Sequence, residues 1–199
     1  MRRSARFWGL GAGITLGATL VLITAFASAA PGGGAQHVRW DLISTTGEPG
    51  AVINPGGHDS ATAPNGGDTI TLTGSGTFVA PPSGRGSGAT TGGGTWTTTS
   101  GDSGTYTVTR LVSWQPANPQ ADVGFIDNID EGTRTNGTAV LVIAFSDGSE
   151  GVLTVGCHGP GAPPGIFEGI ATTKGYITYY MVQAPTAGVN ANRTLFHVR

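Results

Sequence analysis

The stretch TAVLVIAFSDGSEGVLTVGC, residues 138–157, decides the fold. Two mainly apolar and β-branched runs, 138–146 and 149–157, flank Asp147-Gly148. Asp-Gly between two such runs is typical of a two-residue β-hairpin turn in which both residues take a positive φ. The stretch therefore predicts an antiparallel hairpin.

A two-residue turn also fixes the register of this hairpin, because it places Ser146 opposite Ser149. The face that we expect to be the drier one then carries Val140, Val142, Ala144, Leu153, Val155 and Cys157. The other face carries Leu141, Ile143, Phe145, Glu150, Thr154 and, if the strand continues, His158. We expect Cys157 to be an inert core thiol, since apolar burial suppresses the thiolate.

Further strands are predicted on both sides of this hairpin. Apolar residues alternate with Thr or charged residues, and the runs are separated by Gly, Pro, Asn and Asp. The predicted strands cover residues 37–44, 69–79, 96–100, 105–114, 167–172, 175–183 and 194–198, with the hairpin between them. After the N-terminal segment, no window shows the apolar stripe of a helix. Roughly eight strands and no helix predict an all-β fold, a single antiparallel β-barrel or β-sandwich.

The ends of the chain indicate its compartment. Arg2, Arg3 and Arg6 precede an uncharged, largely apolar segment that ends in Ala27-Ser28-Ala29. This order is that of a secretory signal peptide, residues 1–29, with cleavage after Ala29. Residues 30–36 read as a flexible leader, and 37–199 as one all-β domain with Gly/Pro-rich loops near 46–67, 80–94 and 115–136. We expect a secreted, extracellular protein that contacts the membrane only through the uncleaved signal.

Composition narrows the classes of partner. After cleavage, seven basic residues stand against twelve acidic ones, a formal net charge of −5, and Lys174 is the one lysine of the chain. Nucleic-acid binding draws on clustered Lys and Arg, so we expect no nucleic-acid partner. The single cysteine excludes an intrachain disulfide and a multi-thiolate metal site. The remaining partners are a small molecule, a glycan or an extracellular surface.

A few residues could carry chemistry. His158 stands at the mouth of a Gly/Pro-rich loop and could act as a catalytic residue with Glu168 or Glu150. Candidate ligand-binding aromatic residues are Trp114, Tyr176, Tyr179 and Tyr180. Tyr176 and Tyr180 share one face of their strand and Tyr179 takes the other.

Two short motifs are better explained by turns and loops. Residues 101–104, Gly-Asp-Ser-Gly, match the tetrapeptide around a serine-protease nucleophile, yet they fall where a hairpin turn is expected. The acidic stretch 127–132 has Ile129 where a calcium loop needs an oxygen ligand, so we interpret it as a solvated loop and leave calcium as the alternative. The four histidines are scattered. We therefore expect no metal and no cofactor.

From residue 68 onward several short motifs recur around Gly, Thr and aromatic residues. They are Gly-Ser-Gly-Thr-Phe at 74–78, Gly-Gly-Gly-Thr-Trp at 92–96, Gly-Thr-Tyr-x-Val-Thr at 104–109, Phe-Ser-Asp-Gly-Ser-x-Gly-Val-Leu at 145–153 and Phe-Glu-Gly-Ile at 167–170. In these motifs the chain resembles Gly/Thr-rich secreted bacterial proteins of unknown function. The resemblance implies no activity.

Two functions follow as expectations. The favoured one is a non-enzymatic, secreted β-module that binds a ligand or has a structural role at the cell exterior. The alternative is a small-molecule isomerase or hydrolase with a site at the barrel mouth around His158 and Glu168. A filled apolar interior would favour the module, and a buried polar cluster at one barrel end would favour the enzyme.

Overall fold

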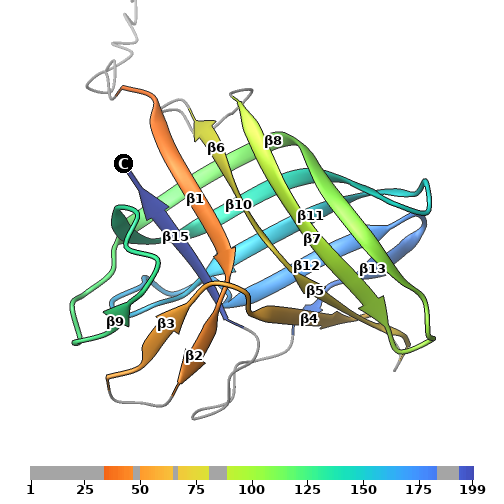
Figure 1. Cartoon of the computed structure of the whole chain (residues 1–199), viewed down its shortest axis with the longest axis horizontal. Helices are drawn as coiled ribbons and strands as arrows, with labels where there is room; N and C mark the ends of the chain where they lie inside the picture. Colours follow the sequence, from red (N-terminus) through yellow and green to blue (C-terminus); the bar gives the residue numbers. More distant parts are fainter. Residues whose placement is uncertain (1–33, 47–49, 65–66, 81–88, 183–192) are drawn as a thin grey trace, which may run out of the picture. The chain divides into compact units, whose positions relative to one another are not determined.

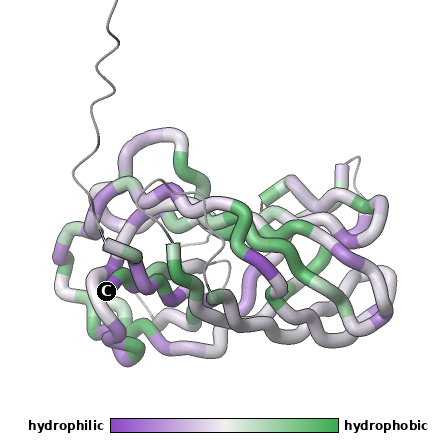
Figure 2. Tube along the Cα trace, turned by 90° about the horizontal axis from the view of Figure 1, so that it is seen from above, coloured by the Kyte–Doolittle hydropathy of each residue, from purple (hydrophilic) through white to green (hydrophobic). Residues whose placement is uncertain are grey.

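A computed structural model describes residues 34–46, 50–64, 67–80, 89–182 and 193–199. The predicted signal peptide, 1–29, lies outside the described residues. The described part is all-β, as predicted, and contains no helix long and apolar enough to cross a bilayer. Short hydrophobic stretches alternate with intermediate and hydrophilic ones along the described chain (Figure 2).

The strands of the described residues are β1 (Gln36–Leu42), β2 (Ser44–Thr46), β3 (Val52–Asn54), β4 (His58–Thr62), β5 (Thr69–Thr73), β6 (Ser75–Ala80), β7 (Thr90–Thr98), β8 (Ser103–Pro119), β9 (Ile126–Asp127), β10 (Thr133–Phe145), β11 (Glu150–Cys157), β12 (Gly169–Lys174), β13 (Ile177–Tyr179), β14 (Met181–Val182) and β15 (Thr194–Val198). They are more numerous than the roughly eight predicted, because several predicted strands are interrupted and because further strands lie in the predicted loops.

Six strands close into a barrel, which decides between the two predicted architectures. The order around the barrel is β10, β15, β1, β6, β7, β8 and back to β10, with antiparallel pairing throughout. Figure 1 shows β1 and β15 lying side by side in front of the long strands. Closure leaves these six strands no exposed edge along the paired segments.

Aromatic side chains fill this barrel. Trp40, Phe78, Trp114 and Phe196 are all fully buried. The ring of Trp114 lies 5.7 Å from that of Phe78 and 4.6 Å from that of Phe196, between centroids. The indole N–H of Trp114 donates to Gln36 Oε1 at 3.0 Å. The barrel interior is therefore a packed core.

The remaining strands of the large sheet form an extension of the barrel. One arm adds β11, β12 and β13 to β10, and the other adds β5, β4 and β14 to β7. The arms meet because Tyr180 alone separates β13 from β14. Inside the extension lie the buried side chains of Ile70, Leu72, Leu153, Val155, Ile170 and Tyr179.

Barrel and extension diverge at two points, which we call the forks. β5 and β6 pair with β7 in one unbroken register through Gly74, but their other edge pairs first with β4 and then with β1. β10 likewise pairs with β15 up to Thr135 and with β11 from Gly137, which leaves the buried Asn136 between them. Gly74 has φ +143°, and a Cβ there would lie 2.5 Å from Gly93 O. A side chain has no room at this fork, so the position requires glycine.

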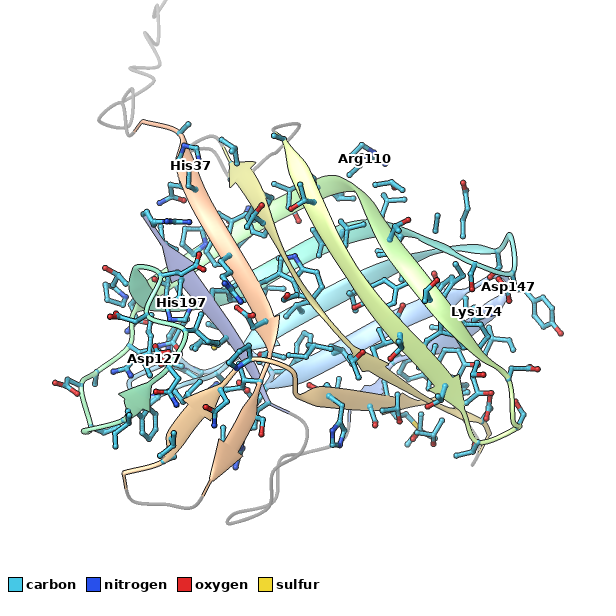
Figure 3. The ribbon with its side chains drawn as sticks, in the orientation of Figure 1. His37, Arg110, Asp127, Asp147, Lys174 and His197 are labelled. Carbon is cyan, nitrogen blue, oxygen red and sulfur yellow. The ribbon has the colours of Figure 1, made fainter. Side chains whose placement is uncertain are left out.

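A small second sheet covers part of the barrel's outer surface. It contains β2, β3 and β9, and β9 belongs to the segment 120–132 between β8 and β10. Asp127 of this segment bonds the buried His197 of β15, with 2.8 Å between Oδ2 and Nε2. Glu131 pairs with Arg39 and Arg199. Figure 3 shows Asp127 and His197 near this sheet, and Asp147 with Lys174 at the other end of the strands.

The central hairpin has a different register from the predicted one. Phe145, not Ser146, pairs with Ser149, so the loop has three residues, and only Gly148 has a positive φ, +87°. One extra loop residue moves the β10 side chains to the opposite face. Leu141, Ile143 and Phe145 are therefore buried with Leu153, Val155 and Cys157, whereas Val140, Val142 and Ala144 are half-buried. The predicted buried face was therefore right for β11 and wrong for β10.

Strands also occupy parts of the three predicted loops. Residues 46–67 contain β3 and β4, residues 80–94 contain the start of β7, and residues 115–136 contain the end of β8, β9 and the start of β10. Glycine density caused this error. A Cβ at Gly94 would lie 1.9 Å from Thr73 O, and one at Gly76 would lie 2.2 Å from Thr91 O. Glycine is required here because neighbouring backbones come so close.

Candidate functional site

A pocket of about 350 Å³ lies beside the fork at Asn136, and we call it the fork pocket. Its walls come from β15, from β3 of the small sheet, from the segment 120–125 and from the residues after β11. The apolar lining includes Ile43, Ala51, Ile53, Val123, Phe125 and Leu195. The polar lining includes Thr45, Gln120, His158, Glu168, Arg193 and Thr194. Apolar walls with a few convergent polar groups are typical of small-molecule sites, and the volume falls at the lower end of their range.

Glu168 stands at the polar end of this pocket, immediately before β12. Its carboxyl group accepts hydrogen bonds from the backbone N–H of His158 and from the backbone N–H of Thr194, the latter at 2.8 Å. Burial raises the pKa of Glu168 to about 7, although these donors and the charge of Arg193 act to lower it. A carboxyl group with this pKa exchanges a proton readily at neutral pH.

His158 follows β11 directly and lines the same pocket. Its Nδ1 lies 2.8 Å from Ile166 O, so Nδ1 carries the proton and donates to that carbonyl. The imidazole ring is exposed. The structure thus brings His158 and Glu168, the two residues singled out from the sequence, together in one pocket. They are connected through the backbone N–H of His158 rather than through the imidazole.

Asp59 is a functional candidate that the sequence did not suggest. It lies on β4 inside the extension, is fully buried, and faces the end at which Glu168 lies. Burial, with a smaller contribution from the charge of Glu168, raises the pKa of Asp59 to about 8, although the hydrogen bond from Ser60 N and the charge of Arg193 act to lower it. Its position within a predicted loop concealed it, since a loop gives no reason to expect burial.

Cys157 and Thr194 complete the polar cluster at this end of the extension. Cys157 is buried, as predicted, and burial raises the pKa of its thiol well above the usual value. Its Sγ donates to Thr194 O at 3.4 Å and accepts from Gln120 Nε2 at 3.2 Å. The Thr194 hydroxyl donates to Gly156 O at 2.5 Å. Neither group is in the state of an activated nucleophile.

The aromatic candidates lie away from the fork pocket. Trp114 is part of the barrel core, and Tyr179 is buried with its hydroxyl donating to Asp68 Oδ2 at 3.1 Å. Tyr176 is 97 % exposed and Tyr180 is 55 % exposed. The predicted single strand over 175–183 is wrong, because Tyr176 lies in the β12–β13 turn and Tyr180 lies between β13 and β14, although Tyr179 is buried and the other two are exposed. None of the four is among the described residues that line the pocket.

The two short motifs take structural positions. Residues 101–104 lie at the tip of the β7–β8 hairpin, where Ser103 begins β8 and is exposed. In the acidic stretch, Asp127 turns toward His197, and its Oδ1 accepts from the backbone N–H groups of Ile129 and Asp130. Within the described ranges, no group of three His, Cys, Asp or Glu side chains is arranged to hold a metal ion.

Comparisons of this chain with protein-family models, with curated proteins and with solved structures found no match. The functional argument therefore depends on the fork pocket itself. Its geometry allows binding of a small molecule, together with proton exchange at Glu168.

Proposed function

We propose that this domain binds a small, mainly apolar molecule in the fork pocket, outside the cell. The observation that carries the proposal is the make-up of the pocket, which combines apolar walls with a half-buried carboxyl group at one end. Among the described residues, the side chains of Trp40, Phe78, Trp114 and Phe196 fill the barrel interior. Export remains a prediction from residues 1–29.

A small molecule fits these features better than a glycan or an extracellular surface. Sugar platforms use exposed aromatic rings, and the exposed rings of Tyr176 and Tyr180 stand apart from the pocket and its polar groups. A macromolecular surface would need a larger patch than the pocket lining provides.

The binding proposal is tested with the purified protein and a panel of small apolar molecules, each with one carbonyl, hydroxyl or amide group. Binding is followed by amide chemical shifts in NMR spectra. Val123→Asp places a charge on the apolar wall at a residue that is 49 % exposed, and we expect it to weaken binding roughly tenfold. Val112→Asp, at a β8 residue that is 38 % exposed and outside the pocket lining, is the matched control. Equal binding by both variants would contradict the proposal.

Acid–base catalysis is the second candidate function, and the pKa of Glu168 near 7 favours it. We favour an isomerase over a hydrolase, because the pocket's thiol and hydroxyl neighbours are not activated as nucleophiles. In such a reaction Glu168 takes a proton from a carbon next to a carbonyl group and returns it at another carbon, while the electron pair moves through the ligand.

The catalytic candidate is tested by deuterium exchange. Small ketones are incubated with the protein in D₂O, and loss of the C–H signal is followed by NMR. We expect Glu168→Gln to abolish exchange while ligand binding persists, and Glu150→Gln, an exposed carboxylate on β11, to leave exchange unchanged. Exchange that survives in Glu168→Gln would remove Glu168 from this role.

A further inference from the structure

Asp59 has no role in the pocket lining, yet its burial needs an explanation. It is fully buried on β4, opposite Leu72 of β5. Its Oδ1 accepts from Ser60 N at 2.7 Å, while Oδ2 has no hydrogen-bond partner among the described residues. A buried carboxylate with an unpartnered oxygen is costly, whereas a protonated carboxyl group is much less so.

The residue after Glu168 brings the two carboxyl groups together. Gly169 has φ +118°, and a Cβ there would lie 3.0 Å from Asp59 Oδ2. Asp59 therefore packs against the backbone of the residue that follows Glu168. The charge of Glu168 also raises the pKa of Asp59.

The two carboxyl groups differ in the donors that they receive. Glu168 accepts from two backbone N–H groups and faces the pocket. Asp59 accepts from one, with its second oxygen buried and unpartnered. Hydrogen bonds to the charged form favour it, so a single negative charge is more stable on Glu168.

The other ionisable groups around the pair are consistent with one charge rather than two. Arg193 is a cation whose charge acts on both carboxyl groups. The Cys157 thiol beside Glu168 stays neutral, because burial raises its pKa. His158 gives Glu168 its backbone N–H, and its ring is turned to Ile166 O.

We infer that Asp59 and Glu168 form one carboxyl pair that holds a single proton near neutral pH, with the proton on Asp59 and the negative charge on Glu168. Asp59 is then a positioning residue, because it stays neutral behind the group that meets the ligand. The inference deepens the proposed function, on which its ligand class rests. An ionised Glu168 selects neutral ligands that offer an O–H, an N–H or an acidified C–H, and it repels carboxylates.

The pair is tested in the ligand-free protein, by NMR titration of side-chain carboxyl carbons after ¹³C labelling. In the wild type we expect both groups to titrate well above the ordinary values near 4. Glu168→Gln should lower the midpoint of Asp59 by about one pH unit, because it removes the neighbouring charge. Asp59→Asn should leave the midpoint of Glu168 in place, because the amide stands in for a protonated carboxyl group. Asp122→Asn, at a side chain that is 88 % exposed, should change neither midpoint.

Two results would overturn the inference. One is ordinary midpoints for both groups in the wild type, a measurement that needs no variant to fold. The other is a lower titration midpoint of Glu168 in Asp59→Asn, by about the one pH unit expected for Asp59 in Glu168→Gln. That result would mean that Asp59 loses its proton before Glu168 does. Because no ligand is present, failure here is distinct from failure of the proposed binding.

Discussion

The barrel and its extension share β7, β8 and β10, yet their interiors differ in kind. In the barrel, aromatic rings from four strands meet and leave no room for a ligand. In the extension, the rings of Trp96 and Tyr106 also pack around Phe145, but the end near the fork holds Asp59, Glu168 and Thr194. One set of strands thus supports a core built for stability and a polar end with ionisable groups. The difference teaches that strand exchange at a fork can create a site without loosening the core.

The largest effect that we expect comes from emptying the barrel. Trp114→Ala removes a fully buried ring that contacts Phe78 and Phe196, and it should lower the free energy of unfolding by about 3–5 kcal/mol. Urea melts at pH 5 measure this loss. Asp59→Asn in the extension, melted in parallel, should cost far less at that pH. A similar loss in both variants would break the distinction between a stabilising interior and a polar end.

The next largest effect that we expect is a pH dependence of stability, caused by two carboxyl groups in the extension. Glu168 and Asp59 have pKa values of about 7 and about 8, above those in an unfolded chain, so the folded state binds more protons between pH 5 and pH 7. The stability from these groups is complete below pH 4 and is lost as pH rises through their folded values. If both groups contribute fully over two pH units, the free energy of unfolding falls by at most about 5 kcal/mol. Partial solvation at the pocket reduces the expected loss to about 3 kcal/mol. Urea melts from pH 5 to pH 7.5 should show this loss of stability. In the Asp59→Asn, Glu168→Gln double variant, the free energy of unfolding should vary much less with pH over the same range.

A smaller effect is expected at the hairpin tip of the extension. Gly148 has φ +87°, which a β-branched residue tolerates poorly, so Gly148→Val should cost about 1–3 kcal/mol. Gly34→Val is the control, because Gly34 has no such φ and open space around it. Urea midpoints at one pH compare the two, and an unchanged midpoint for Gly148→Val would refute the positive φ at Gly148.

The smallest effect is expected at Tyr176. Its side chain is 97 % exposed beside the β12–β13 turn, so Tyr176→Ser should change stability by no more than about 0.5 kcal/mol. Ligand binding at the fork pocket should also stay the same, because Tyr176 does not line it. Loss of binding in this variant would move the site toward the tyrosine face.

The sequence predicted the all-β class, the Asp147-Gly148 hairpin and the burial of Cys157. Alternation of apolar and polar residues indicates where strands lie, but it does not indicate which strands pair with each other. The closed barrel depends on β1 meeting β15 and on the forks at Gly74 and Asn136, and these are long-range pairings. No local pattern encodes them.

The candidate site was predictable in part. His158 and Glu168 were identified as ionisable residues next to a Gly/Pro-rich loop, and the structure places both in one pocket. Asp59 was missed because Gly56 and Gly57 made its surroundings look like a loop. A Cβ at Gly57 would lie 1.9 Å from Ile43 O, so this glycine is there for close backbone contact.

The pairing of β1 with β15 has a consequence for how the molecule folds. About 150 residues separate the two strands, and the backbone of His37 exchanges hydrogen bonds with that of Arg199. β1 cannot close the barrel until β15 reaches it, so the decisive contact has a high contact order. We therefore expect slow folding, in milliseconds to seconds, with the seam between these strands as its last event. Until β15 has been synthesised, the β1 edge stays unpaired and is open to pairing with other chains.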